Sequence, residues 1–191
     1  MDIEIKDLRK VYGTQTVVDI KELTIHAGEL IGLVGNNGAG KTTLMRLILD
    51  LIKADDGYVL SNGMKVNENE AWKHYTGSFI DGRFLIDFYT PEEYFTFIGT
   101  VYGLSKEIID ERLSRYAPLM HDEILGTKKY IRDFSEGNRQ KIGIIGAMLI
   151  NPQILILDEA TSSVDSHSEQ LIQKATDKMT EGRTSIIIAH R

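Results

Sequence analysis

Apolar residues alternate with polar ones over the first part of the chain. Ile3 and Ile5 are separated by a charged residue, and the segment 17–25 places apolar residues at similar intervals, with turns expected near Gly13 and Gly28. Alternation of this kind is typical of strands that bury one face. The pattern predicts a small, mainly antiparallel β region at the start of the chain.

Two later runs are apolar without alternation. They span 30–34 and 154–157. Both are predicted to be buried strands, and the second is expected to belong to a parallel sheet that is covered on both faces. A short strand is predicted at 76–80, and the last strand at 184–189. Asn62-Gly63 separates two further short apolar segments and is a strong hairpin signal.

Other segments repeat their apolar residues at helical spacing. One face shared by Leu44, Leu47, Ile48 and Leu51 predicts a helix over 42–51. The segment 90–93 (TPEE) has an N-cap, a proline at the first helical position and the glutamate of a capping box, so it predicts a helix start. Further helices are predicted at 106–116, from Ser135 through Ile150, and from the capping box of Ser166 and Glu169 to about Met179. Helices between strands indicate an α/β fold.

The length of 191 residues suits one compact α/β domain, or one domain with a small inserted subdomain. The 191 residues include 28 acidic and 22 basic side chains, and the resulting net charge of −6 disfavours nonspecific binding of nucleic acid. The absence of cysteine excludes disulfides, thiolate zinc sites and thiol catalysis. The first residues are not a secretory signal, and the longest apolar stretch, 142–150, is shorter than the roughly 20 residues that span a bilayer. A role at a membrane is therefore expected to need a partner.

A glycine-rich loop follows the predicted strand at 30–34. It consists of Gly35, Asn36, Asn37, Gly38, Ala39, Gly40, Lys41, Thr42 and Thr43. Glycines let the backbone curl so that its N–H groups point inward, and the following helix presents its positive dipole end to the same anion. Lys41 can reach the β- and γ-phosphates, and Thr42 can bind Mg²⁺. The alternative is an ordinary strand–turn–helix junction, but the whole pattern favours nucleotide binding.

Two carboxylates, Asp158 and Glu159, follow the apolar run at 154–157. Ligands of open α/β sheets bind at the carboxyl ends of the strands, so these acids and the glycine-rich loop are expected to converge on one site. Asp158 would hold Mg²⁺, directly or through water, and Glu159 would accept a proton from the water that attacks the γ-phosphate. Alone, the pair would indicate a solvated strand end. Together with the loop, it predicts nucleotide hydrolysis.

With these motifs in place, the chain resembles the ATP-binding cassette (ABC) ATPases over nearly its whole length. The segment 134–141 (FSEGNRQK) resembles the family's signature Leu-Ser-Gly-Gly-Gln, and Glu136 and Asn138 depart from it. The resemblance implies a P-loop NTPase (RecA-like) parallel-sheet core with an N-terminal antiparallel β region and an inserted helical subdomain. It also implies a head-to-tail dimer, in which each ATP lies between one phosphate loop and the partner's signature residues Ser135, Gly137 and Asn138. A simple helix N-cap at Ser135 is the alternative.

The resemblance assigns roles to four more residues. Tyr12 matches the aromatic residue that stacks on adenine, although packing within the β region is an alternative. His190 matches the switch histidine that contacts the γ-phosphate. Asp165 matches the loop that couples the two sites, although capping the next helix is an alternative. Asp81 stands where the family has a glutamine and is a candidate ligand of Mg²⁺.

Two parts of the chain resemble different branches of this family. The segment 89–95 resembles prokaryotic export-type cassettes that are encoded apart from their membrane subunit, and part of the aromatic stretch 94–97 is expected to contact that subunit. The segments 159–165 and 189–191 resemble cassettes that are fused to their membrane domain. We hypothesise a composite chain, truncated after the switch histidine.

These observations predict a single ABC ATPase domain over 1–191. It divides into a β region and phosphate-loop core (1–82), a helical subdomain with the signature segment (83–150) and the rest of the core (151–191). We expect a cytoplasmic cassette that hydrolyses ATP with Mg²⁺, forms a homodimer or heterodimer, and lies on the inner face of the cell membrane through a separate transmembrane subunit. No nucleic acid is expected. The alternatives are a soluble cassette that regulates a nucleic-acid or ribosome partner, and a binding-only cassette with impaired hydrolysis.

Overall fold

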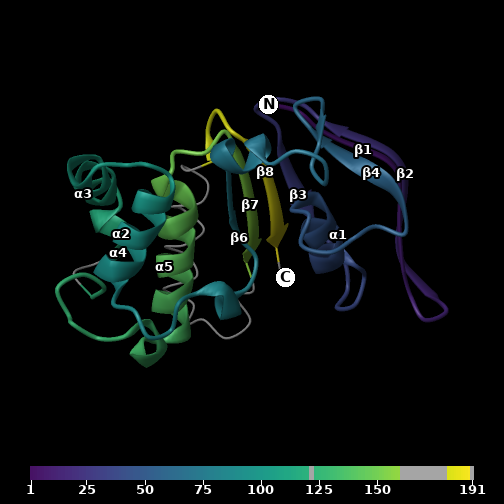
Figure 1. Cartoon of the computed structure of the whole chain (residues 1–191). Coiled ribbons are helices and arrows are strands. Elements are labelled where there is room, and N and C mark those ends of the chain that lie inside the picture. The colour runs from purple at the N-terminus through teal and green to yellow at the C-terminus, as the bar shows by residue number, and fades with distance from the viewer. Residues whose placement is uncertain (121–122, 160–179, 190–191) are drawn as a thin grey trace.

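The computed structural model of the chain describes residues 1–120, 123–159 and 180–189. These residues form two four-stranded sheets. Figure 1 shows the antiparallel sheet on one side of the molecule, the parallel sheet in the middle and a group of helices on the other side. The arrangement has the α/β layers that the sequence predicts.

The antiparallel sheet has the strand order β2-β1-β4-β5. Its strands are β1 (Ile3–Tyr12), β2 (Gln15–Ile25), β4 (Asp56–Ser61) and β5 (Met64–Lys65). Asn62 and Gly63 have positive φ angles of 50° and 77°, as a tight turn between antiparallel strands requires. The predicted β region and its hairpin are confirmed.

The parallel sheet has the strand order β3-β8-β7-β6. Its strands are β3 (Leu30–Leu33), β6 (Thr76–Phe79), β7 (Ile154–Glu159) and β8 (Thr184–Ala189). Each neighbouring pair is parallel. The carboxyl ends of β3 and β7 therefore point in the same direction and lie at the same end of the sheet, with β8 between them.

Strand β3 is less buried than the sequence predicts. Leu30 is 53% exposed and Val34, just after the strand, is 75% exposed. Among the described strands, β3 is last in the order and pairs with β8 alone. A terminal strand has a neighbour on one side only, so fewer elements cover its side chains. The prediction of a buried strand at 30–34 is wrong for this reason.

Helix α1 (Lys41–Ile48) ends before Leu51, to which the prediction extended it. Asp50 takes the left-handed conformation, with a φ of 50°. Its N–H donates to the carbonyl of Leu47 over 3.2 Å, and the N–H of Leu51 donates to the carbonyl of Arg46 over 2.8 Å. This pair of bonds is a Schellman motif, which ends a helix.

Of the remaining helices, η1 (Ala71–Tyr75) precedes β6 in the chain. Those between β6 and β7 are η2 (Gly82–Phe84), α2 (Pro91–Val101), α3 (Lys106–Ser114), α4 (Ala117–Met120), η3 (Ile131–Asp133) and α5 (Glu136–Leu149). The predicted capping box at the start of α2 is present, because Thr90 and Glu93 exchange hydrogen bonds. The helices predicted at 106–116 and after Ser135 are confirmed with slightly shifted ends. The helix predicted from Ser166 to Met179 lies outside the described residues.

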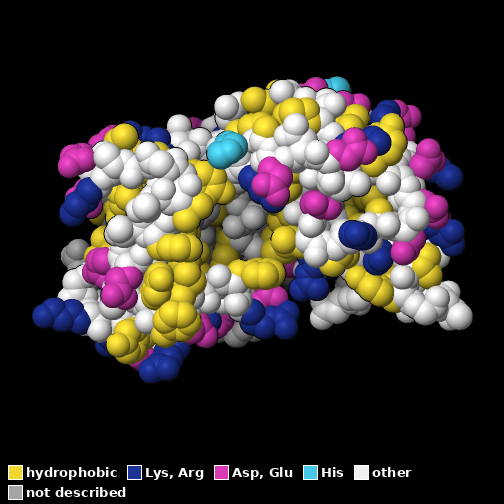
Figure 2. Space-filling model, in the orientation of Figure 1, with side chains coloured by type: hydrophobic (Ala, Val, Ile, Leu, Met, Phe, Trp, Pro, Cys, Tyr) yellow, Lys and Arg dark blue, Asp and Glu magenta, His cyan; other side chains and the backbone are white. Residues whose placement is uncertain are grey.

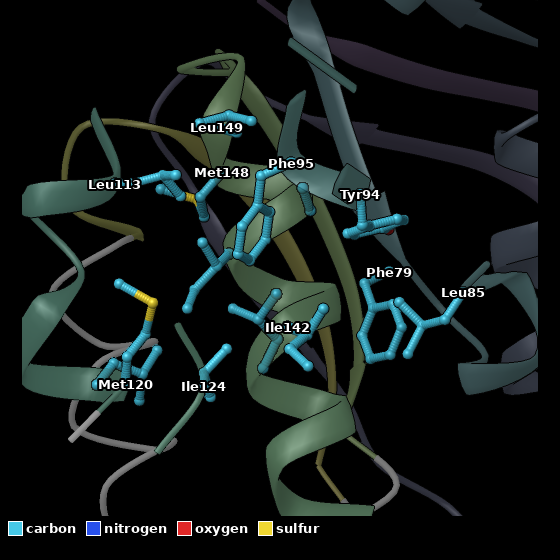
Figure 3. Packing of buried hydrophobic residues seen from close by; sticks show 14 of the residues in the cluster. Phe79, Leu85, Tyr94, Phe95, Leu113, Met120, Ile124, Ile142, Met148 and Leu149 are labelled. Atoms are coloured by element: carbon cyan, nitrogen blue, oxygen red, sulfur yellow. The ribbon is translucent and has the colours of Figure 1, made fainter. Parts of the chain in front are cut away.

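Strand β7 divides the two hydrophobic cores. Leu155 and Leu157 pack with α2 to α5, whereas Ile154 and Ile156 pack with α1 and the antiparallel sheet. Figure 3 shows other members of the first core, such as Phe95 and Ile142. Successive side chains of a strand point to opposite faces, so β7 supplies both cores in turn. The phosphate-loop helix and the helical layer are therefore separated by the parallel sheet. The division of the chain at 82 and 150 into subdomains stays a prediction.

Candidate nucleotide site

The glycine-rich loop joins β3 to α1 through two residues in the left-handed conformation. Gly38 and Gly40 have φ angles of 84° and 85°, which glycine adopts at little cost. A Cβ on Gly40 would lie 2.4 Å from the carbonyl oxygen of Val17 in β2. The loop therefore packs directly against the antiparallel sheet, and this contact fixes where α1 begins.

The ammonium group of Lys41 lies within the curve of this loop. Its Nζ donates to the carbonyl oxygens of Gly35 at 2.6 Å and Asn36 at 3.1 Å. Gly40 occupies the N-cap of α1, and no side chain of the described residues caps this helix. Its first amides are thus available to an anion, which the positive end of the helix dipole also attracts. An ammonium group beside backbone N–H donors can bind the oxygens of a phosphate group.

The loop meets the acidic end of β7 at Thr42 and Asp158. The Thr42 hydroxyl donates to Oδ2 of Asp158 over 3.0 Å, although 116 residues separate them in the chain. Hydroxyl and carboxylate oxygens are ligands that Mg²⁺ accepts, and it commonly completes its shell with water and phosphate oxygens. In the described part of the chain, no group of three His, Cys, Asp or Glu side chains offers an all-protein cage. The donor set therefore fits a magnesium ion that arrives with a nucleotide.

Three predicted residues lie at or beyond the limits of the described chain. The backbone of Glu159 ends β7 and pairs with Ala189 of β8, but its side chain lies outside what the structure describes. His190 and Asp165 lie outside the described residues, as do the segment 160–165 and the end of the chain from 190. Because Ala189 precedes His190, the register brings the backbones that lead to Glu159 and His190 together.

Tyr12 ends β1 at the hairpin with β2, where it pairs with Gln15. Its side chain is 50% exposed, and the ammonium group of Lys10 lies 5.5 Å from its ring centroid. The following residues of β2, from 17 to 20, line an open pocket of about 320 Å³ together with Ala39, Gly40 and Lys41 of the loop. Tyr12 is not among the residues that line this pocket. Its half-exposed ring leaves surface on which a base could stack.

Asp81 is held by two arginines. Its Oδ2 lies 2.9 Å from Nε of Arg83 and 3.6 Å from Nη2 of Arg46 in α1. The hydrogen bond from the Arg83 side chain, above all, lowers the pKa of Asp81. Its oxygens already interact with two arginines, so Asp81 is less suited than Asp158 to bind a metal ion. Sequence reasoning missed both arginines, although Arg46 lies one helical turn after Thr42.

The signature residues gather at the start of α5. The Ser135 hydroxyl accepts from the N–H of Asn138 over 3.3 Å, and Nδ2 of Asn138 donates to Glu123 over 3.3 Å. Ser135 is thus an N-cap, as the alternative interpretation holds, and Gly137 beside it is buried. Since α5 packs in the core opposite to that of α1, the structure does not bring the signature residues to the chain's own phosphate loop.

Residues 18–162 match the family described as ABC transporter. The chain belongs to the ABC transporter family. The match runs from β2 to just beyond β7, so it includes the loop, Asp81, the signature segment and the acidic end of β7. The chain is accordingly an ABC transporter nucleotide-binding domain.

Relatives of this ABC cassette include a flippase and an import protein by name. The ATP-dependent lipid A-core flippase of Syntrophus aciditrophicus is 36% identical over 208 residues, which cover 99% of this chain and 32% of the flippase. The sulfate/thiosulfate import ATP-binding protein CysA of Pectobacterium atrosepticum is 29% identical over 202 residues, which cover 100% of this chain and 59% of that protein. The cassette spans less than two thirds of either relative.

Solved ABC cassettes share the fold. An ATP-binding subunit of an ABC transporter superposes with a TM-score of 0.82 at 26% identity, covering 100% of this chain and 80% of that chain. A dimeric bacterial ABC transporter cassette superposes with a TM-score of 0.84 at 23% identity, covering 99% and 88% of the two chains. The predicted P-loop NTPase fold, with its antiparallel β region and its helices, is confirmed.

Proposed function

We propose that this cassette binds and hydrolyses ATP to drive a transporter. The observation that carries the proposal is the hydrogen bond between Thr42 and Asp158, because it joins the phosphate loop to the acidic end of β7. Nucleotide hydrolysis at this type of site depends on positioning and electrostatic stabilisation, which both motifs supply.

Each residue of the site has a distinct task in this proposal. The loop amides and Lys41 hold the triphosphate, and Thr42 and Asp158 hold Mg²⁺, which neutralises charge on the β- and γ-phosphates when bound. Glu159 accepts a proton from the water whose oxygen attacks the γ-phosphorus. The bond from that phosphorus to the bridging oxygen breaks, and ADP leaves. His190 orients the γ-phosphate, and Tyr12 stacks on the adenine.

The signature residues serve a second cassette in this scheme. Ser135, Gly137 and Asn138 lie at the start of α5, a helix that packs in the core opposite to that of α1, which supports contact with the nucleotide of a partner. Asp165 couples the two sites across a homodimer or heterodimer. A solved family member is itself a dimeric cassette, which lends support to this arrangement.

The decisive experiment compares ATP turnover of the chain with that of Glu159→Gln. We expect turnover to fall by at least about 100-fold, as for the loss of a general base, and an ATP-bound dimer to accumulate. Lys41→Ala should weaken ATP binding by at least about tenfold through the lost charge. Glu181→Gln, an exposed acid before β8, is the matched control. Equal turnover in Glu159→Gln and the parent would contradict the role of Glu159.

The partner in this proposal is a separate transmembrane subunit of an export-type transporter. No helix in the described part of the cassette is both long enough and apolar enough to cross a bilayer. The higher identity to the flippase, 36% against 29% for the importer, supports export. The cassette then acts at the inner face of the membrane through its partner.

One observation favours a second candidate, a cassette that binds ATP but hydrolyses it poorly. Asp81, in the place of the family's glutamine, is engaged by Arg46 and Arg83. Two cations beside this acid hinder it from orienting a metal or a water. Tight ATP binding with equally negligible turnover in the parent and in Glu159→Gln would establish this candidate.

A further inference from the structure

Arg139 lies in the first turn of α5, directly after the signature residues. Its side chain is only 16% exposed. The guanidinium group donates to Oδ1 of Asp87 at 2.8 Å and to the carbonyl oxygens of Ile131 at 3.2 Å and Gly82 at 3.3 Å. A planar fork with several donors suits such a set of acceptors, and a lysine would not reproduce it.

The acceptors belong to separate segments around the start of α5. Gly82 begins η2, Asp87 lies between η2 and α2, and Ile131 begins η3. Nε of Arg139 also lies 3.9 Å from Oε2 of Glu136, which departs from the family's signature. A single side chain therefore ties the first turn of α5 to the segment that follows β6 and to η3.

The same segment after β6 also contacts the phosphate-loop helix. Asp81, the residue before Gly82, lies 3.6 Å from Arg46 of α1. Asp81 contacts α1 and the adjoining Gly82 accepts a hydrogen bond from Arg139. These two contacts thus connect α1 with α5, and Arg139 lies at the α5 end. It is largely shielded from water, so its charged hydrogen bonds are worth more than those of an exposed pair.

We propose that Arg139 is a positioning residue, which fixes the start of α5 so that Ser135, Gly137 and Asn138 meet the nucleotide of the partner cassette. The inference rests on the proposed function. Arg139 itself contacts neither ATP nor Mg²⁺. It acts by holding the first turn of α5 against the segment that leads back to α1.

The test uses Arg139→Gln in the Glu159→Gln chain. In the monomer, amide hydrogen exchange over 136–140 should become at least about tenfold faster, because the turn loses its anchors. The ATP-dependent dimer, measured by analytical ultracentrifugation, should weaken by at least about tenfold. The affinity of the monomer for a fluorescent ATP analogue should change by less than about twofold, since the phosphate loop is untouched.

Two further variants separate positioning from a general loss of charge. Arg139→Lys keeps the charge without the fork and should give intermediate exchange and dimer affinity. Arg115→Gln removes an exposed cation that pairs with Glu111, and it should leave both measurements unchanged. Unchanged exchange in Arg139→Gln, or an equal effect of Arg115→Gln, overturns the proposal. A third outcome separates the two proposals. If Arg139→Gln exchanges faster but the Glu159→Gln chain never dimerises with ATP, the positioning role of Arg139 is supported and the proposed dimer is refuted.

Discussion

Gly40 meets two requirements at the start of α1, whereas Gly38 meets one. Both have φ angles near the left-handed minimum, 85° and 84°. A Cβ on Gly40 would lie 2.4 Å from the carbonyl oxygen of Val17, but a Cβ on Gly38 meets no atom within 4 Å. A comparison of alanine variants at the two positions therefore distinguishes the cost of the left-handed backbone from the cost of a steric clash.

We predict that Gly40→Ala destabilises the cassette more than Gly38→Ala does. Both variants force alanine into the left-handed region, at about 1–3 kcal/mol, and Gly40→Ala must also displace β2 or the loop. Urea unfolding should show an additional loss of about 1–3 kcal/mol for Gly40→Ala. Its affinity for ATP should fall by about tenfold as the loop shifts. Equal unfolding free energies in the two variants would contradict the steric role of Gly40.

Tyr94 gives the cassette a predicted sensitivity to alkaline pH. Burial of its hydroxyl raises its pKa from 10.0 to about 12. The unfolded chain loses this proton first as the pH rises through 10, so stability that is present below pH 10 is lost progressively up to pH 12. The loss amounts to about 1.4 kcal/mol per pH unit, or about 2–3 kcal/mol in all.

The Tyr94→Phe variant isolates this contribution because it keeps the ring. Burial also raises the pKa of Tyr102 and Tyr116, so a smaller alkaline slope should remain in the variant. Unfolding free energies at pH 9 and above, measured for both proteins, provide the test. Parallel pH profiles would show that the Tyr94 phenol is not desolvated.

Helix α5 approaches β6 closely because glycines line the contact. A Cβ on Gly143 would lie 2.2 Å from the ring of Phe79, and a Cβ on Gly77 would lie 2.2 Å from the carbonyl oxygen of Ala147. Phe79 and residues of α5 such as Ile142 are shown in Figure 3. This packing sets the distance between the sheet and the helix that carries the signature residues.

We predict that Gly143→Ala destabilises the cassette although alanine favours helices. Overpacking of a tight core costs about 1–3 kcal/mol, and the helix gains about 1 kcal/mol from the substitution. At a separation of 2.2 Å the clash should win, with a net loss of about 2 kcal/mol. Phe79→Leu should remove the clash, so the double variant should unfold at nearly the same free energy as Phe79→Leu alone. Simple additivity of the two losses would contradict the contact.

The elements that the sequence predicts well depend on local signals. The capping box of Thr90 and the turn at Asn62-Gly63 are encoded within four residues and appear as predicted. The end of α1 was missed because Asp50, and not glycine, takes the left-handed position there. The exposure of β3 was missed because burial follows from strand order, which no local pattern contains.

The same contrast holds at the site. The meeting of Thr42 with Asp158 was predictable because the carboxyl ends of parallel strands share one edge. The contacts of Arg139 were not predictable, because its acceptor Gly82 lies 57 residues away in the chain and no sequence motif pairs the two residues. Local patterns thus identify a phosphate site, but they do not show what positions the signature residues.

At the scale of the whole molecule, exposed aromatic rings gather on the helical side. We call Phe88, Tyr89 and Phe97 the aromatic surface. Phe88 and Phe97 are 67% and 45% exposed, and Tyr89 meets Phe88 and Phe97 edge to face at ring-centroid distances of 5.4 and 6.0 Å. Figure 2 shows hydrophobic side chains over the helical part of the face in view. Exposed patches of this kind mark interaction sites.

Charge indicates what this surface binds. Glu92 and Glu93 line a shallow pocket of about 480 Å³ together with Tyr89, Thr96 and Phe97. Apolar rings beside two carboxylates are complementary to a short segment with apolar residues and at least one basic residue. In the proposed function, that segment belongs to the separate membrane subunit.

The last prediction therefore concerns assembly. Phe88→Ser with Phe97→Ser should abolish co-purification with the membrane subunit and leave ATP binding within about twofold, since neither ring touches the phosphate loop. Tyr58→Ser, which removes an exposed ring from the antiparallel sheet, is the matched control and should co-purify normally. Binding by the unaltered cassette should weaken as salt rises, because Glu92 and Glu93 contribute through charge. Retention of the membrane subunit by the double variant, or equal loss in Tyr58→Ser, would place the docking site elsewhere on the cassette.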